Sequence, residues 1–205
     1  IPTTNGLYVV DIYAQYDTKL EDFEHIMEHG TMMAITCNNN GTLAVGFEDG
    51  HVLLYDLTAK YEPVKVWKSF AKILPESITC LHFASDTELL VGGATKNLLS
   101  LNIGTDTQVT TTMPFRDHGI STLISLDNTN TIVSGGWDGK LRLFKHDPHN
   151  ITQTTLTQDH HYDTITDLHY AHLHTPIPAG SLLQTTSDIV VSAGKDCIIN
   201  IWRFT

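Results

Sequence analysis

Cysteine is scarce in this chain and follows no pairing pattern. The three cysteines, Cys37, Cys80 and Cys197, stand far apart and form no CxxC motif. An odd number of isolated cysteines argues against a disulfide framework and against zinc held by cysteine pairs. Each one lies in an apolar stretch, so the sequence predicts three buried, reduced thiols in an intracellular protein.

Long apolar segments and basic clusters are also missing. No apolar run approaches the roughly 18 residues of a membrane-spanning helix, and the first residues show no signal-peptide pattern. The chain has 12 Lys and Arg against 23 Asp and Glu, a net charge of −11, and its densest basic stretch, 60–72, is loosely populated. Such a surface repels phosphate backbones. We therefore predict neither membrane insertion nor direct nucleic-acid binding.

Catalytic motifs are absent as well. There is no GxSxG elbow and no glycine loop that would cradle a phosphate. Two Ser, His and Asp sets do occur, but a set that recurs in a repeated segment is expected to hold strands together, whereas a catalytic triad occurs once, beside an oxyanion hole. We predict a non-enzymatic protein with no catalytic residues, no cofactor and no metal site. The two sets are Ser134, His118 and Asp138, and Ser192, His161 and Asp196.

What the chain does contain is a repeat. Four segments share one phase: small residues, then Asp or a substitute, an apolar residue three positions on and an aromatic residue or Leu six positions on. Each predicts two alternating strands joined by a tight turn, and another apolar stretch precedes each turn. The anchor residues, separated by 46, 43 and 58 residues, are Asp49, Thr95, Asp138 and Asp196.

A period of about 43 residues, with His before the first strand, Asp in the turn and a terminal aromatic residue, resembles the WD40 repeat. The resemblance implies an all-β WD40 β-propeller with about four blades here, at 29–74, 75–117, 118–159 and 160–205. It also implies a hydrogen-bonded chain of His, Ser or Thr, Asp and Trp that pins each blade. The last unit is complete, with His160 as an alternative to His161, and the third is partial. The expected pinning residues are His118, Ser134, Asp138, His161, Ser192, Asp196 and Trp202.

The ends of the chain indicate a larger ring. The sequence begins at Ile1 without an initiator Met and stops after the third strand of the last unit, so that blade is expected to lack its outer strand. Residues 1–28 are predicted to be the end of a preceding blade plus an acidic linker, although Leu7–Tyr13 could instead supply the missing outer strand. About three further N-terminal blades of the same parent protein would complete a seven-bladed ring.

Histidines concentrate in the last unit, partly within a predicted surface insertion near 171–185. Imidazoles that converge with Asp163 or Asp167 could bind a metal. The favoured interpretation is that one histidine pins the blade and that the others belong to an exposed insertion. The histidines concerned are His149, His160, His161, His169, His172 and His174.

The residue before each anchor is predicted to lie on the rim of one propeller face, where WD40 proteins commonly contact partners. Trp137 stands out, because aromatic anchors dominate protein interfaces. Its alternative role is packing over Gly119 or a neighbouring blade. Phe47 presents a weaker case. The candidate partner-binding residues are Phe47, Glu48, Trp137 and Lys195, and Ala94 is the equivalent residue of the second unit.

Three segments, 43–56, 134–144 and 191–202, occur in an order that resembles the C-terminal half of the ASTRA-associated WD-repeat proteins of fungi. Their animal relative is the guanine-nucleotide-binding beta-subunit-like protein. The resemblance covers 31–205 except for the insertion. It implies a scaffold subunit of an ASTRA-type chromatin-remodelling or kinase-assembly chaperone complex, in the nucleus and secondarily the cytoplasm. The implied partners are Tel2, Tti and Rvb-type proteins and a large phosphatidylinositol-3-kinase-like protein.

Two alternatives stay open. The chain could be a WD40 adaptor of another assembly, such as a ubiquitin ligase, a vesicle coat or a G-protein-like complex. It could also be a metal-binding or enzymatic propeller that uses the His-rich insertion.

Overall fold

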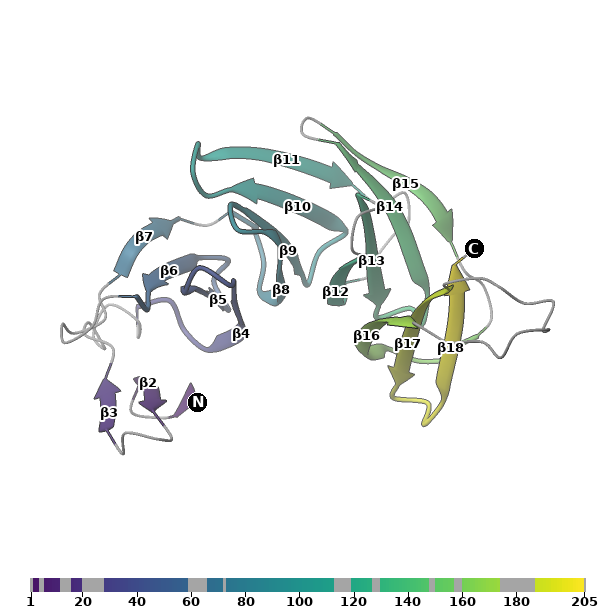
Figure 1. Cartoon of the computed structure of the whole chain (residues 1–205), viewed down its shortest axis with the longest axis horizontal. Coiled ribbons are helices and arrows are strands. Elements are labelled where there is room, and N and C mark those ends of the chain that lie inside the picture. The colour runs from purple at the N-terminus through teal and green to yellow at the C-terminus, as the bar shows by residue number, and fades with distance from the viewer. Residues whose placement is uncertain are drawn as a thin grey trace, which may run out of the picture.

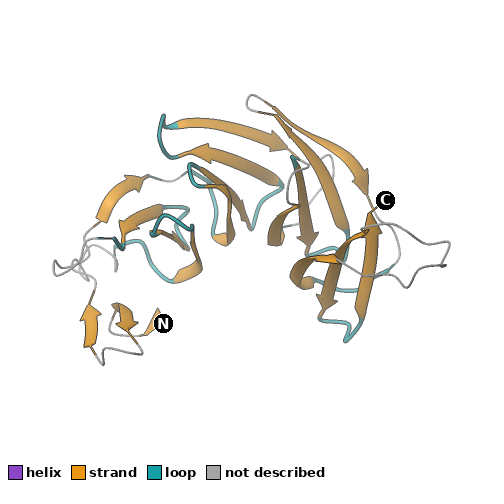
Figure 2. Cartoon of the chain, viewed as in Figure 1, coloured by secondary structure: helices purple, strands orange, loops and turns teal. Residues whose placement is uncertain are grey.

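The described part of the chain consists of β-sheets that follow one another along an arc (Figures 1 and 2). All regular elements among the described residues are strands, so the all-β prediction is confirmed. None of these residues forms a helix that could cross a membrane. The computed structural model describes residues 2–3, 6–11, 16–19, 28–58, 66–71, 73–112, 119–126, 130–147, 150–156, 160–173 and 187–204.

Three sheets have four antiparallel strands paired in chain order. The first blade contains β4 (Met32–Cys37), β5 (Thr42–Phe47), β6 (Val52–Asp56) and β7 (Val66–Phe70). The second contains β8 (Ile78–Ser85), β9 (Glu88–Gly93), β10 (Asn97–Asn102) and β11 (Thr107–Thr112). The third contains β12 (Ile120–Leu126), β13 (Thr131–Gly136), β14 (Leu141–Asp147) and β15 (Asn150–Leu156).

The two terminal sheets have three described strands each. The fourth blade contains β16 (Ile165–Leu173), β17 (Ser187–Gly194) and β18 (Ile199–Phe204). Of the predicted insertion near 171–185, residues 171–173 belong to β16 and 174–185 lie outside the described residues. The N-terminal sheet contains β1 (Pro2–Thr3), β2 (Gly6–Asp11) and β3 (Tyr16–Lys19).

β3 lies in a segment that the sequence indicated as linker. Its residues pair antiparallel with β2, Tyr16 opposite Asp11 and Lys19 opposite Tyr8. A polar surface does not prevent a strand from forming, because the ladder is made by backbone groups. The acidic stretch 20–27 lies outside the described residues.

The innermost strand of every blade carries a β-bulge at the same place. The register shifts between Met32 and Ala34, and the equivalent shifts follow Ile78, Ile120 and Ile165. A bulge turns the side chain of the extra residue in a new direction. In the second blade this residue is Thr79, whose hydroxyl donates to the Ile120 carbonyl of the next blade. Ser121 donates in the same way to the Ile165 carbonyl. The bulges thus tie neighbouring blades together.

The core is a series of apolar layers between blades. β5, β9 and β13 are buried on both faces, which explains their nearly continuous apolar sequences. The layer between the first and second blades, for example, contains Leu54, Ile78 and Leu89, all fully buried. Similar layers follow between the next two pairs of blades.

The small residues of the repeat allow this close packing. A Cβ added to Gly46 would lie 2.5 Å from Ile78, and one added to Gly92 would lie 2.9 Å from Ile120. Both isoleucines begin the innermost strand of the following blade. The glycine three residues before the anchor is therefore a packing requirement.

Only one of the three cysteines is buried in the way that the sequence predicted. Burial raises the pKa of Cys80 to about 12, so its thiol stays protonated. Cys37 and Cys197 are exposed, and that part of the prediction was wrong. Cys37 lies on the open side of β4, and Cys197 lies in the turn after β17 instead of in a strand.

Candidate functional site

The four anchor residues perform one local task. Each side-chain oxygen accepts the backbone N–H of the residue two positions on, closing the turn between the second and third strands of the blade. The distances are 3.1 Å at Asp49, 3.2 Å at Thr95, 3.2 Å at Asp138 and 3.1 Å at Asp196. A short side chain with an oxygen acceptor is all that this bond needs. Thr95 can therefore replace Asp without loss of the repeat phase.

The residue before each anchor is also fixed in the same way in all four blades. Its backbone N–H donates to a carbonyl just ahead of the innermost strand, at 2.9 Å from Glu48, 2.9 Å from Ala94, 3.0 Å from Trp137 and 2.9 Å from Lys195. The four residues consequently occupy equivalent places on successive blades. We call the surface formed by Glu48, Ala94, Trp137 and Lys195 the turn face.

Trp137 packs against Gly119 on one side and is partly exposed on the other. A Cβ on Gly119 would lie 2.7 Å from the indole, so one side of the ring packs over this glycine. The side chain is nevertheless 41% exposed. Its backbone is held by the N–H bond to the Gly119 carbonyl and by the Thr164 hydroxyl, which donates to the Trp137 carbonyl at 3.3 Å. Trp137 is therefore a rigid, half-exposed aromatic side chain.

Tyr162, which the sequence did not single out, lies in the segment packed against the same turn. A Cβ on Gly139 would lie 2.5 Å from the His161 carbonyl, which shows how closely that segment approaches. The Tyr162 side chain is 81% exposed, and its N–H donates to Asp196 Oδ2 at 2.8 Å. The available signal was an aromatic residue directly after the pinning His161, outside the repeat phase.

The other candidate contact residues divide into two groups. Glu48 and Lys195 are exposed at their places on the turn face. Phe47 is completely buried and packs against the ring of His29, with centroids 5.5 Å apart. It is a core residue with no surface for a partner, which corrects the expectation. The physical reason is that Phe47 is the last residue of β5, a strand that is buried on both faces.

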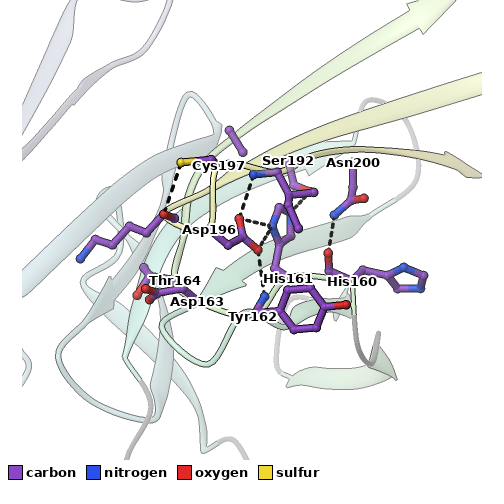
Figure 3. Close-up of polar contacts among 12 residues, drawn as sticks. His160, His161, Tyr162, Asp163, Thr164, Ser192, Asp196, Cys197 and Asn200 are labelled. Atoms are coloured by element: carbon purple, nitrogen blue, oxygen red, sulfur yellow. Dashed lines mark hydrogen bonds and ion pairs between the residues drawn. The ribbon is translucent and has the colours of Figure 1, made fainter.

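The fourth blade joins four side chains by hydrogen bonds, and Figure 3 shows His161, Ser192 and Asp196 among them. His161 Nδ1 lies 3.1 and 3.0 Å from the two Asp196 oxygens, and His161 Nε2 lies 2.8 Å from Ser192 Oγ. The Trp202 indole N–H also reaches Ser192 Oγ, at 2.9 Å. His160 is not part of this chain, because its ring meets Trp202 edge-on.

The Asp196 carboxylate is held in its ionised form. Burial by itself would raise its pKa. The backbone N–H groups of Tyr162 and Ile198 and the ring of His161 outweigh burial and lower the pKa below the ordinary value.

The third blade is built differently from the expected pinning set. Asp138 forms a two-pronged ion pair with Arg142, at 3.0 Å to Nη1 and 2.6 Å to Nη2, and the arginine is fully buried. Ser134 Oγ is buried without a hydrogen-bond partner among the described residues. His118 lies outside the described residues. In the sequence, Arg142 is marked by its position, since it is a charged residue four positions after the anchor and between Leu141 and Leu143.

The first blade places His29 Nδ1 2.9 Å and His51 Nδ1 2.8 Å from Asp49 Oδ2. Burial raises the pKa of this carboxylate, but the two imidazoles and the His51 backbone N–H lower it below the ordinary value overall. The sequence predicted no metal site, and histidines of the last unit were its alternative. Among the residues that the structure describes, His29, Asp49 and His51 form a group that could hold an ion.

A groove of about 600 Å³ lies between the third and fourth blades, lined by residues of β14 and β18 that include Leu143, Trp202 and Phe204. His160 and Arg203 are its ionisable residues, and it has no carboxylate or thiol. Its lining combines apolar side chains with the polar residues Thr155 and Asn200.

Comparisons with known proteins agree with the repeat. The family model described as WD domain, G-beta repeat matches residues 107–145. This range runs from β11, the outer strand of the second blade, into β14 of the third. No curated protein sequence matches the chain.

Solved structures match at low identity. The computationally designed Ika8 protein has a TM-score of 0.69 and 19% identity, over 98% of this chain and 53% of its own. A chain of the mitotic checkpoint complex has a TM-score of 0.64 and 15% identity, and the match covers 85% of this chain and 51% of that one. Sqt1 of Saccharomyces cerevisiae has a TM-score of 0.63 and 16% identity, and the match covers 81% of this chain and 41% of Sqt1. The chain thus spans about half the length of these structures.

Taken together, the family model and the shared fold support the WD40 repeat family and a set of propeller blades. None of the comparisons points to the ASTRA-associated proteins.

Proposed function

We propose that this chain is a protein-interaction scaffold that binds its partner on the turn face, with Trp137 as the main contact residue. The WD40 fold supports the general role. The observation that carries the specific one is the half-exposed indole of Trp137, fixed on a hydrogen-bonded turn. A rigid aromatic side chain loses little conformational entropy on binding.

The exposed part of Trp137 is large enough to matter energetically. Complete burial of an aromatic side chain removes 150–250 Å² from water, so covering the remaining exposed portion contributes about 2 kcal/mol at roughly 25 cal/mol per Å². Tyr162 adds a second exposed ring from the adjacent segment. Residues of this kind, Trp and Tyr, are the commonest interface hot spots.

Replacing Trp137 by Ala tests the proposal. We expect partner binding to weaken about thirtyfold, which corresponds to about 2 kcal/mol, as measured by biolayer interferometry with the purified partner. Tyr162→Ala should weaken binding as well, and it removes a side chain that is almost wholly exposed.

The matched control is Asn39→Ala. Asn39 is exposed in the turn between β4 and β5, and successive turns of an antiparallel sheet alternate between its two ends. This variant should bind as the wild type does. Unchanged binding by both aromatic variants, with unfolding curves like those of the wild type, would contradict the proposed contact.

For the identity of the partner, we propose an ASTRA-type assembly that contains Tel2, Tti and Rvb-type proteins and a large phosphatidylinositol-3-kinase-like protein, in the nucleus and secondarily the cytoplasm. The similarity of 43–56, 134–144 and 191–202 to ASTRA-associated WD-repeat proteins supports it. Affinity purification followed by mass spectrometry distinguishes it from the alternatives. Recovery of kinase-assembly chaperones supports the proposal, and recovery of vesicle-coat or ubiquitin-ligase subunits contradicts it.

We also propose that N-terminal blades of the same parent protein adjoin this chain. Exposed apolar side chains on the two terminal blades support this idea. Met33 and Ile35 of β4 are 47% and 49% exposed, and Ile199 and Ile201 of β18 are 70% and 68% exposed. Further blades would cover such faces. Measuring the intact mass of the natural protein checks this, and a folded monomer near 22.8 kDa would exclude it.

A further inference from the structure

The first blade brings two imidazoles and a carboxylate to one point. His29 Nδ1 and His51 Nδ1 lie 2.9 and 2.8 Å from the same oxygen, Asp49 Oδ2. The two rings are stacked, with centroids 4.0 Å apart and planes 29° apart. Within the described part of the chain, these residues offer three potential ligand atoms that all lie within 4.8 Å of one another.

Pinning of the blade does not account for this arrangement. In the fourth blade the histidine continues through Ser192 to Trp202. The corresponding residues of the first blade are Val45 and Tyr55, so the hydroxyl that receives the second imidazole nitrogen is missing. Instead, His51 stands where the fourth blade has Ile198 and places a second imidazole against the carboxylate. The first blade therefore lacks the hydrogen-bonded chain of the fourth and has, at the same place, side chains of the types that bind metal ions.

The group is held in position before any ion binds. Asp49 Oδ1 accepts the His51 backbone N–H at 3.1 Å, which directs Oδ2 toward both rings. Phe47 packs against the His29 ring and restricts its rotation. The Phe47 N–H donates to the His51 carbonyl at 3.0 Å and closes the turn. The side chains of Asp49 and His51 are 36% and 19% exposed, so an ion can reach them from solvent.

We propose that His29, Asp49 and His51 form a binding site for a divalent transition-metal ion, with Zn²⁺ as the preferred occupant. Two imidazole nitrogens and one carboxylate oxygen are a zinc ligand set that leaves a fourth position for water or for a side chain of a partner. Donors about 2.1 Å from one zinc ion are roughly 3.0–3.4 Å apart. The observed N to O separations of 2.8 and 2.9 Å need only a small expansion.

Titration of the metal-free chain with ZnCl₂ at pH 7.5, followed by calorimetry, tests this site. We expect one equivalent to bind to this site in the wild type. His51→Ile and His51→Asn introduce the residues that the fourth and second blades have at this position. Both should weaken zinc binding by more than about tenfold, because even loss of a supporting residue around a metal has that effect. Zinc should raise the Tm of the wild type more than that of either variant.

The matched control is His172→Gln, which removes an exposed histidine that pairs with Asp188 at 2.6 Å in the fourth blade. It should leave zinc affinity unchanged. Melting curves of the metal-free variants establish that each is folded. The proposal is overturned if the wild type binds no zinc, if both His51 variants retain wild-type affinity, or if His172→Gln abolishes binding.

Discussion

At the scale of single residues, the turns of the blades differ at the residue that follows the anchor. Gly50 and Gly139 have φ of +87° and +72°, in the left-handed region that favours glycine. Cys197, the equivalent residue of the fourth blade, has φ of +62° although it carries a side chain. The turn of the fourth blade therefore contains strain that the first and third turns avoid.

Cys197→Gly is expected to stabilise the protein. A left-handed conformation costs a residue with a Cβ roughly 1–2 kcal/mol, and the greater freedom of glycine in the unfolded chain offsets part of the gain. We expect a net increase of about 0.5–1 kcal/mol in the free energy of unfolding, measured in urea.

The opposite substitution in the third blade provides the comparison. Gly139→Ala should destabilise by more than about 1 kcal/mol, because the left-handed strain is joined by a Cβ that would lie 2.5 Å from the His161 carbonyl. Equal and small effects of both substitutions would show that φ does not limit the stability of these turns.

At the scale of the element, each blade has its own way of holding the turn to the strands. The fourth uses His161, Ser192 and Trp202, and the third uses the buried pair of Asp138 and Arg142. In the second, Thr95 accepts the backbone N–H of Asn97. The anchor is thus common to all blades, and what it binds beyond the turn is particular to each.

Ser192→Ala measures how much the hydrogen-bonded chain from His161 through Ser192 to Trp202 contributes to the stability of the protein. The substitution removes the acceptor of the Trp202 indole and the partner of His161 Nε2, and leaving buried polar groups unsatisfied costs about 1–3 kcal/mol. We expect a loss of this size in the free energy of unfolding, measured in guanidinium.

Ser134→Ala is the matched control in the third blade, at the same position before the anchor. Ser134 is equally buried, and its hydroxyl makes no hydrogen bond to any residue that the structure describes. Its replacement should not destabilise the protein, because no hydrogen bond of this hydroxyl to a described residue is lost. Equal losses in the free energy of unfolding of the two variants would mean that burial of the serine, and not its hydrogen bonds, explains the effect.

At the scale of the whole molecule, polar contacts complement the apolar layers between blades. His82 of β8 and Ser125 of β12 join the second and third blades, with the Ser125 N–H donating to His82 Nε2 at 3.0 Å. Nε2 must carry a lone pair to accept this bond, so the imidazole is neutral. Burial lowers the pKa of His82 below its ordinary value of 6.5, in agreement with this state.

Acidification should therefore weaken the contact between these blades. The unfolded chain takes up a proton at His82 near pH 6.5, whereas the folded protein does so only at a lower pH. The contribution to stability is present above pH 6.5 and is lost as pH falls toward the lowered pKa. Denaturation at pH 7.5 and 5.5 should show a larger loss in the wild type than in His82→Gln, which does not titrate. An equal loss in both would exclude His82 as the cause.

The sequence by itself determined the all-β fold, the turns and their phase. These features depend on contacts within a few residues, such as the bond from Asp49 to the N–H of His51, so local sequence suffices to specify them. The glycine three residues before each of the first three anchors, as at Gly92, was visible for the same reason, although its packing against the next blade was not.

Only the tertiary structure decided which side chains are available for function. Phe47 is the last residue of β5 and is fully buried, whereas Trp137 is the first residue after β13 and is 41% exposed. How far each side chain is covered depends on segments that are distant in sequence, such as Gly119 beside Trp137. The grouping of His29 with His51 around Asp49 likewise requires the first strand to return beside the turn. Burial and convergence are set by long-range packing, which no local pattern records.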